Sequence, residues 1–169
     1  FLGHVYEALN ATVKSFGQFL TPDSIAKMMG HVTFGATEIE QGKIIKLNDP
    51  ACGAGALLIE AAEAYMSNGG RQGELLLYGE DLDATACCIT YVQFSLLGYA
   101  AIVTHQDTLC MKVYEGPWFT PGYFMHGMPM RLIADRMGKR NDEKKSDDDA
   151  HKEKPIDVRE FVQGEFDFL

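Results

Sequence analysis

The fold is decided by residues 43–58, which read KIIKLNDPACGAGALL. Residues 43–48 form a short, mostly apolar run, which is typical of a largely buried strand. Residues 49–55 follow as a turn that contains two glycines. Residues 56–66 are strong helix formers, and the sequence NGG at residues 68–70 then ends the helix. The stretch therefore predicts a strand, a glycine-rich turn and a helix in direct succession.

The chain continues with the same alternation on the carboxyl side of this stretch. Residues 75–79 predict a second strand, residues 84–97 a second helix, and residues 101–104 a third strand. Helical connections of this length join parallel strands through right-handed crossovers. Ahead of the first strand, residues 3–15 have apolar side chains at helical spacing, and residues 21–32 begin a helix with Thr-Pro. We therefore predict an α/β fold with a doubly wound, mostly parallel sheet and an N-terminal helical segment.

The composition is that of one domain with a real core, since 46% of the 169 residues are hydrophobic. Lys and Arg number 15 against 24 Asp and Glu, which gives a net charge of −9. A protein that binds nucleic acid by itself normally carries a basic face, so we expect no such activity from this chain alone. No apolar run approaches the ~18 residues of a membrane helix, and no secretory signal pattern opens the chain. Because the chain begins at Phe1, we expect a trimmed or partial chain.

The four cysteines are Cys52, Cys87, Cys88 and Cys110. They form no Cys-x-x-Cys pair and no His cluster joins them, so we expect no metal site. Four cysteines are also too few for a disulfide scaffold of this size. The interpretation is four reduced, mostly buried thiols in a cytoplasmic protein.

Three acidic residues follow the three predicted strands: Asp49, Asp81 and Asp107. Ligands of a doubly wound sheet bind outside the carboxyl ends of its strands, where these acids lie. A carboxylate at Asp49 suits a ligand that is cationic there, such as the amino and sulfonium groups of S-adenosylmethionine. A carboxylate after the second strand suits a ribose diol, and one after the third suits an adenine amino group. The alternative is that Asp49 and Asp81 merely cap the helices that follow them.

Two common nucleotide motifs are missing from the glycine turn. A dinucleotide site needs Gly-x-Gly-x-x-Gly, and Leu58 stands where the third glycine belongs. A P-loop is excluded because no Gly-Lys-Ser/Thr follows the glycines. The turn therefore indicates a different ligand.

Four segments, taken in order, resemble one known family: GQFLTP at residues 17–22, DPACGAG at 49–55, YGEDLD at 78–83 and QDTL at 106–109. They are similar to segments of the N6-adenine DNA methyltransferases, most closely the modification subunits of type I restriction systems, which have Gly in place of Gln106. The resemblance implies a Rossmann-like methyltransferase fold and S-adenosylmethionine as the cofactor.

The resemblance also implies roles for single residues. Thr21 and the neighbouring backbone would hold the methionine carboxylate, and Asp49 with the turn backbone would line the methionine moiety. The implied cofactor-binding residues are Gln18, Phe19, Thr21, Pro22, Asp49, Pro50, Ala51, Cys52, Gly53, Gly55, Glu80, Asp81, Leu82, Asp107 and Leu109.

The adenosine part of the cofactor would meet the second and third acidic segments. Asp81 would hold the ribose hydroxyls, with Glu80 as the competing residue. Leu82 and Leu109 would pack on the adenine ring, and Asp107 would hold its amino group. These roles come from the resemblance and are expectations for this chain.

The sequence departs from the family at its catalytic motif, Asn-Pro-Pro-Tyr or Asn-Pro-Pro-Phe, because no Asn-Pro pair occurs in the 169 residues. In the family, the asparagine and a proline carbonyl accept hydrogen bonds from the target amino group, and the aromatic ring stacks on the flipped base. Residues 120–123 (TPGY) are either a degenerate remnant of this motif or an aromatic surface or core segment. We favour the second interpretation and assign no catalytic residue.

The leading functional hypothesis is an S-adenosylmethionine-binding protein for adenine-N6 DNA methylation in a restriction-modification system. DNA would be bound only together with other subunits, such as a specificity or restriction subunit. The alternative is a non-catalytic binding or assembly module that kept the methyltransferase fold. A third hypothesis is methyl transfer to another acceptor, for which His105, His126 and Tyr123 offer polar groups.

The sequence changes character in its last third. Residues 114–130 predict an irregular aromatic segment, and residues 131–137 one or two helical turns. Residues 139–154 mix both charges with almost no apolar side chain, which predicts a mobile loop or linker. We therefore divide the chain into a methyltransferase-like cofactor-binding domain at 1–137, a charged linker at 138–155, and a tail at 156–169 that closes the fold or docks a partner.

Overall fold

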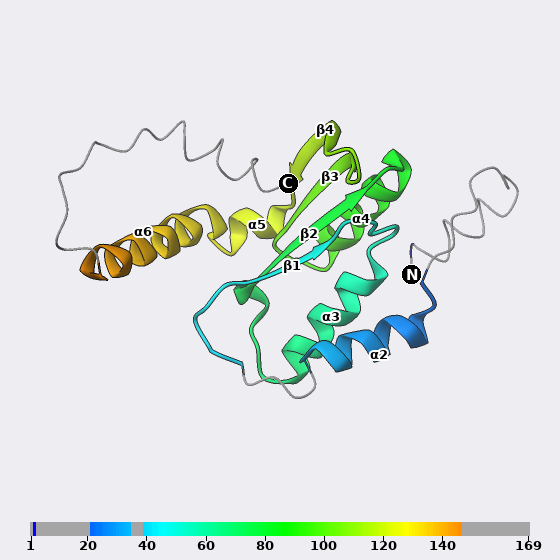
Figure 1. The fold of residues 1–169 in the computed structure, drawn as a ribbon. Helices are drawn as coiled ribbons and strands as arrows, with labels where there is room; N and C mark the ends of the chain where they lie inside the picture. Colours follow the sequence, from blue (N-terminus) through cyan, green and yellow to red (C-terminus); the bar gives the residue numbers. More distant parts are fainter. Residues whose placement is uncertain (1, 3–20, 35–38, 147–169) are drawn as a thin grey trace, which may run out of the picture. The chain divides into compact units, whose positions relative to one another are not determined.

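The computed structural model describes Leu2, residues 21–34 and residues 39–146 (Figure 1). The predictions for residues 3–15, Gln18, Phe19 and the tail therefore lie outside the described residues. The chain divides into two compact units, residues 1–130 and residues 131–169. The sheet and the predicted site belong to the first unit.

A four-stranded sheet forms the centre of the first unit (Figure 1). Strands β1 (Ile45–Asp49), β2 (Leu75–Asp81) and β3 (Ala101–Asp107) are parallel neighbours in that order. Strand β4 (Lys112–Phe119) returns antiparallel beside β3. The predicted α/β class with a mostly parallel sheet is confirmed.

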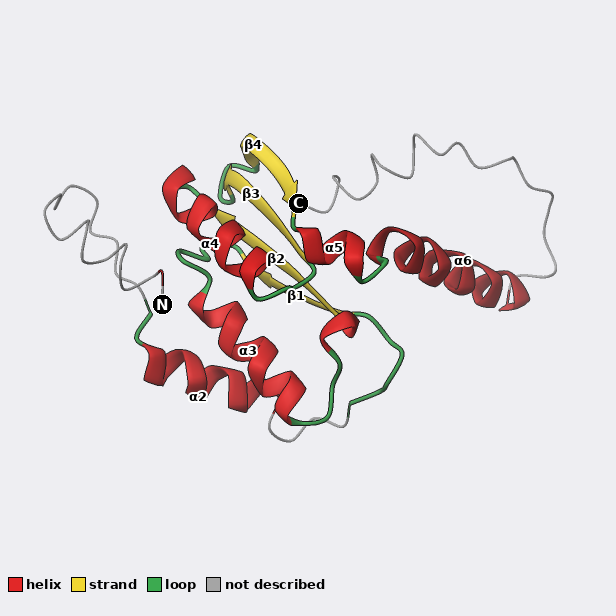
Figure 2. Ribbon diagram, turned by 180° about the vertical axis from the view of Figure 1, so that it is seen from behind, coloured by secondary structure: helices red, strands yellow, loops and turns green. Residues whose placement is uncertain are grey.

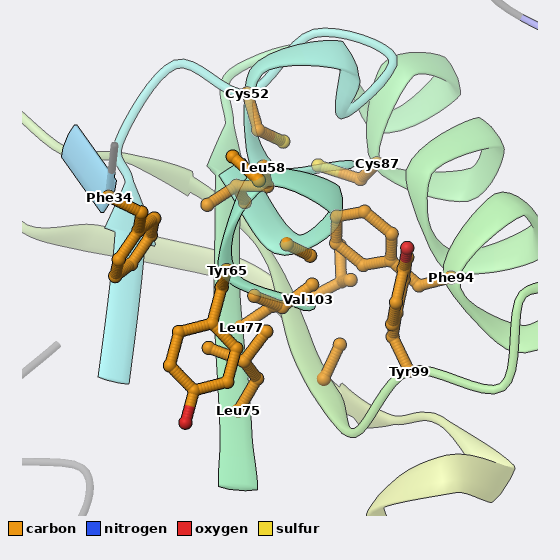
Figure 3. Packing of buried hydrophobic residues seen from close by; sticks show 13 residues of the cluster. Phe34, Cys52, Leu58, Tyr65, Leu75, Leu77, Cys87, Phe94, Tyr99 and Val103 are labelled. Carbon is orange, nitrogen blue, oxygen red and sulfur yellow. The ribbon is translucent and has the colours of Figure 1, made fainter. Parts of the chain in front are cut away.

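The two crossover helices, α3 (Ala56–Ser67) and α4 (Ala84–Leu96), pack on the same face of the sheet (Figure 2). Side chains alternate between the faces of a strand, so Leu75 and Leu77 of β2 point to one side. They meet Tyr65 of α3 and Phe94 of α4 in one buried cluster, together with Val103 of β3 (Figure 3). This arrangement brings both strand-to-helix turns to the carboxyl edge of the sheet.

Helix α2 (Asp23–Phe34) begins after the predicted Thr-Pro start and packs closely on α3. Ala26 of α2 is fully buried, and a Cβ built on Gly30 would lie 2.7 Å from the carbonyl oxygen of Glu60 in α3. A side chain at Gly30 would therefore push the two helices apart.

The prediction of an irregular segment at residues 114–130 is wrong. Residues 112–119 form β4, and Gly116-Pro117 lies where its register with β3 shifts, a position at which an edge strand accepts proline. Helix α5 (Pro121–Met125) then begins with proline, whose fixed φ suits a first helical position. The glycine and proline signals thus belong to a bulge and a helix start.

Helix α6 (Met128–Ser146) is longer than the one or two turns expected. It continues into the mixed-charge residues because Lys, Arg and Glu are good helix formers. The domain boundaries stay predictions. In the described part of the chain, no helix combines the length and apolar character that a membrane crossing requires.

Candidate functional site

The ends of the three parallel strands bring the predicted acidic residues to one edge of the sheet. In the register, Asp49 of β1 lies beside Gly79 of β2, and Asp81 of β2 lies beside His105 of β3. Asp107 is the last residue of β3. The structure therefore gathers at one edge the three strand ends that carry the three predicted acids.

The glycine turn between β1 and α3 depends on left-handed backbone. Gly53 and Gly55 have φ values of 54° and 81°, which glycine adopts without steric cost. The backbone N–H of Gly55 donates to the carbonyl of Cys52 at 2.7 Å and closes the turn. A Cβ on Gly55 would also lie 3.0 Å from the ring of Phe94. Both the conformation and the space require glycine at this position.

The two helices that start at this edge have different N-termini. Among the described residues no side chain caps α3, whose N-cap is Gly55 and whose first turn holds no acid. Helix α4 is capped by Asp83, whose carboxylate accepts from the N–H of Thr85 at 2.8 Å. The first N–H groups of a helix need acceptors from elsewhere, so the start of α3 is a potential anion site.

The alternative that Asp49 and Asp81 are helix caps is contradicted by these contacts. Asp49 accepts from the N–H of Ala51 at 3.1 Å, inside the turn. Asp81 accepts from the N–H of Gly53 at 2.7 Å and from that of Asp83 at 2.8 Å. Asp81 is 6% exposed, so it braces the glycine turn from the end of the neighbouring strand.

Glu80, the competing candidate for the ribose, is bonded to two side chains at the end of β3. Its carboxylate accepts from the side-chain amide of Gln106 and, at 3.2 Å, from the hydroxyl of Thr108. The hydroxyl of Thr108 also lies 3.0 Å from the carbonyl of Pro50, so the side chain of Glu80 is linked to the turn through Thr108, whereas Asp81 bonds the N–H of Gly53 directly. The geometry favours Asp81 as the acid that lies against the glycine turn.

The electrostatics of the edge are those of crowded carboxylates. Partial burial raises the pKa of Asp49 above its ordinary value, and the charges of Asp81 and Glu80 raise it further. The hydrogen bond from Ala51 opposes this shift only in part. A cationic group beside Asp49 would relieve this repulsion, because an opposite charge favours the ionised form.

Asp107 and the two predicted adenine-packing leucines lie around the same edge. The carboxylate of Asp107 accepts from the N–H groups of Leu109 and Cys110, both at 3.0 Å, and the bond from Cys110 is the main cause of its lowered pKa. The side chains of Leu82 and Leu109 are 62% and 97% exposed, so both are accessible to a ligand. Their contact with an adenine ring stays a prediction.

Thr108 is a residue that the sequence reasoning missed. Its hydroxyl lies 3.0 Å from the carbonyl oxygen of Pro50 and so connects the β3–β4 turn to the glycine turn. Sequence reasoning also missed Thr90 and Gln93 of α4, which bond carbonyls of the glycine turn. Two polar residues three positions apart on an otherwise apolar helix could have indicated a buried polar contact. Thr21 and Pro22 lie exposed before α2, and the carbonyl of Pro22 accepts from the N–H of Ile25.

The cysteines are half buried and half exposed, which corrects the expectation of mostly buried thiols. All four are free; Cys52 and Cys87 are buried, whereas Cys88 and Cys110 are exposed. Burial raises the pKa of Cys52 strongly and that of Cys87 to about 12. The thiol of Cys52 beside the glycine turn is therefore protonated and a poor nucleophile.

Residues 120–123 are a structural segment, as the favoured interpretation has it. Thr120 is fully buried beside Ala101, where β3 begins, so it lies at the end of the sheet opposite to Asp107. Its hydroxyl donates to the carbonyl of Tyr99 at 2.7 Å and accepts from the N–H of Ala101 at 2.9 Å. The hydroxyl thus uses its one donor and one of its two lone pairs, and complete burial keeps the other lone pair from a substrate.

The acceptor groups of the third hypothesis are separated by the fold. Tyr123 is buried in α5, and His126 lies 3.0 Å from the carbonyl of Gly98, so both belong to the end where β3 begins. Only His105 lies at the site edge, where its ring is 3.1 Å from the carbonyl of Leu82.

The fold and the site together define a Rossmann-like α/β domain with a glycine turn at the carboxyl edge of its sheet. The model of the family described as N-6 DNA Methylase matches residues 1–127. The chain belongs to this family, as the four segments predict.

Two relatives show which members of the family the chain is similar to. It is 33% identical over 92 residues to the type I restriction enzyme MjaIX methylase subunit of Methanocaldococcus jannaschii, a match that covers 54% of this chain and 15% of that protein. The crystal structure of the type I restriction-modification system methyltransferase subunit from Streptococcus thermophilus is 26% identical. That match covers 64% of this chain and 23% of the other, with a TM-score of 0.49. The chain therefore spans only a small part of each relative.

Proposed function

We propose that this chain supplies the S-adenosylmethionine-binding part of an adenine-N6 DNA methyltransferase subunit in a type I restriction-modification system. Membership of the N-6 DNA Methylase family supports the reaction class. The name of the curated relative, a methylase subunit of a type I restriction enzyme, supports the system. The cofactor would supply the methyl group, and the residues of the carboxyl edge would bind and orient it.

One observation carries the proposal: the turn between β1 and α3 begins at a carboxylate, Asp49, and ends at a helix N-terminus that no described side chain caps. The methionine part of the cofactor is a zwitterion, with an ammonium beside a carboxylate. Asp49 offers the negative partner, and the N–H groups at the start of α3, which no described side chain caps, offer the positive one. A phosphate-bearing ligand would meet the same N–H groups but would be repelled by Asp49.

The remaining groups of the cofactor find matching chemistry along the edge. Asp81 uses each carboxylate oxygen for one backbone N–H, and lone pairs remain for ribose hydroxyls. The exposed side chains of Leu82 and Leu109 offer apolar contact to an adenine ring, with Asp107 as the acceptor for its amino group.

DNA binding is proposed only for a complex with other subunits, because the chain carries a net charge of −9. The base pocket is not assigned to residues 120–123, since the hydroxyl of Thr120 is bonded to the backbone of Tyr99 and Ala101 at the start of β3. Four free cysteines fit the cytoplasm as the site of action.

The test is calorimetric titration of the 169-residue chain with S-adenosylmethionine and, separately, with S-adenosylhomocysteine. We expect saturable one-to-one binding of both, and no competition by NAD or ATP. Loss of the signal in Asp81→Asn would identify the carboxyl edge as the site. Absence of binding at millimolar cofactor, or equal binding of NAD, would overturn the proposal.

A second candidate function is a non-catalytic module, favoured by the absence of an Asn-Pro pair in the 169 residues. The two candidates differ in one measurement. Methyl transfer to adenine in DNA by the assembled subunits, abolished by Asp81→Asn in this chain, supports the enzyme. Cofactor binding without any dependence of transfer on Asp81 supports the module.

A further inference from the structure

Two side chains of α4 donate hydrogen bonds to backbone carbonyls of the glycine turn. The hydroxyl of Thr90 donates to the carbonyl of Gly53 at 2.8 Å, and the amide of Gln93 donates to the carbonyl of Ala54 at 2.5 Å. These contacts join residues 37 and 39 positions apart in the chain. They connect the turn after β1 to the helix after β2.

Both polar side chains are buried, although apolar side chains at these positions would avoid the free-energy cost of removing polar groups from water. Thr90 is 0% exposed and Gln93 is 8% exposed, on a helix face that otherwise buries Ala86, Cys87 and Phe94. Burying a hydroxyl or an amide is unfavourable unless it is hydrogen-bonded, and apolar residues would fill the same space. The polar pair is therefore explained by the turn carbonyls it binds.

The bond from Thr90 determines the direction of the peptide between Gly53 and Ala54. In a trans peptide the N–H points opposite to the C=O, so a Gly53 carbonyl directed at Thr90 turns the N–H of Ala54 away from α4. The neighbouring peptides are bound as well, since the N–H of Gly53 donates to Asp81 and that of Gly55 donates to the carbonyl of Cys52. Every peptide from residue 52 to residue 55 thus has at least one hydrogen-bonded group.

Without these anchors the turn would not keep its shape, because glycine adopts many backbone conformations at little cost. Gln93 is anchored in turn, since its side-chain oxygen accepts from the N–H of Leu2 at 3.2 Å. The methyl group of Thr90 adds packing, as it lies against both Gly55 and Gly79.

We propose that Thr90 and Gln93 are positioning residues, which orient the peptides of residues 53–55 for the ligand of the glycine turn. This inference rests on the proposed function for the identity of that ligand. The two residues touch the turn from the side of α4, and their effect on the ligand is indirect.

The central variant is Thr90→Val, which removes the donor and keeps the shape, and Thr120→Val is its matched control. Thr120 is also a fully buried threonine whose hydroxyl bonds a backbone carbonyl, but it lies at the opposite end of the sheet. Titration with S-adenosylmethionine, well below the melting temperature of each variant, gives Kd. We expect Thr90→Val to raise Kd about tenfold, because a net hydrogen bond is lost, and Thr120→Val to leave Kd unchanged.

Two further variants separate positioning from general destabilisation. Thr90→Ser retains the hydroxyl and loses the methyl group, so it should restore most of the affinity while lowering the melting temperature. Gln93→Met, close to isosteric, should raise Kd like Thr90→Val. Equal affinity of Thr90→Val, Gln93→Met and the wild-type chain would overturn the inference, as would an equal loss of affinity in Thr120→Val.

Hydrogen exchange of the amides of residues 53–55, measured by NMR without ligand, keeps the inference testable if the wild-type chain binds no cofactor. Faster exchange and shifted resonances in Thr90→Val, but not in Thr120→Val, would support the positioning role while the proposed function fails. Unchanged exchange in both variants would overturn the positioning role itself.

Discussion

Glu74 and Asp49 lie at opposite ends of the central sheet, and the fold shifts the pKa values of their carboxyl groups in opposite directions. Glu74, in the short helix η1 (Gln72–Glu74) before β2, is 4% exposed and accepts from Gly42, Arg71 and the hydroxyl of Tyr65 at 2.6, 3.2 and 3.2 Å. The Gly42 bond is the largest cause of its lowered pKa. Asp49, at the other end, has a raised pKa because burial and neighbouring carboxylates outweigh its bond to Ala51.

The difference separates an end whose carboxylate stabilises the fold from the end at which we propose that the cofactor binds. A carboxylate with enough donors stabilises the folded chain in its ionised form, as Glu74 does. A carboxylate whose folded pKa is raised opposes folding near neutral pH, so Asp49 is expected to be retained for another purpose. The following variants test this difference between the two ends of the sheet, in order of decreasing expected effect.

Glu74→Gln should destabilise the fold most. The amide NH₂ of glutamine would face donors that need an acceptor, and each buried donor left unsatisfied costs roughly 1–3 kcal/mol. We expect a loss of about 3 kcal/mol in the free energy of unfolding, measured with urea, and an unchanged Kd for S-adenosylmethionine. A variant as stable as the wild-type chain would contradict the structural role of Glu74.

The same carboxylate predicts a pH dependence with a definite sign. Because the pKa of Glu74 is lower in the folded than in the unfolded chain, its stabilisation is complete above the ordinary glutamate pKa. It is lost as the pH falls through the folded value. The free energy of unfolding should therefore decline on acidification more steeply in the wild-type chain than in Glu74→Gln; parallel curves would exclude this linkage.

Asp81→Asn should weaken cofactor binding and should also lower stability, because the amide NH₂ would face one of the two backbone N–H groups that the carboxylate binds. Loss of a charged partner for the ribose hydroxyls costs ~1.5–3 kcal/mol, which raises Kd roughly ten- to hundredfold. Asp83→Asn is the control, because asparagine caps a helix as well as aspartate does. Similar affinities of both variants in calorimetry would remove the ribose assignment.

Asp49→Asn should stabilise the chain without ligand by less than about 1 kcal/mol, since the group is only partly buried. Its folded pKa is raised, so the ionised form opposes folding at neutral pH, and the difference between variant and wild type should vanish as the pH falls. The cofactor-induced rise in melting temperature should shrink in the variant. An unchanged rise would show that Asp49 does not meet the cofactor.

The smallest effect is expected in the β3–β4 turn, where Met111 has a φ of 54°. A non-glycine residue in the left-handed region costs about 1 kcal/mol, so Met111→Gly should raise the free energy of unfolding by roughly 0.5–1 kcal/mol. Met111→Ala, which keeps a Cβ, should give no gain. Equal stabilities of both variants would show that the backbone of this turn is relaxed.

Several features of the site could be predicted from local sequence because they depend on neighbouring residues. Apolar runs and helix-forming stretches predicted β1, α3, β2, α4 and β3, and the two glycines predicted a turn between β1 and α3, whose backbone the structure shows to be left-handed at both glycines. The acids after the strands had to meet at one edge once the strands were parallel. The strand β4 was missed because glycine and proline signal a loop locally, whereas pairing with β3 accommodates them at a register shift.

Local sequence was enough to give the order of strands and crossover helices from β1 to β3, the glycine turn and the edge at which the acids gather. Tertiary contacts made Asp81 the acid that bonds the turn directly, while Glu80 bonds Gln106 and Thr108, and the structure shows that Asp83 is the cap of α4. The tertiary structure also decided that Thr90 and Gln93 bind the turn, while Thr120 serves the far end of the sheet. The physical reason is range: propensities and glycine conformations are local, whereas a hydrogen-bond partner across the core exists only after the strands have paired.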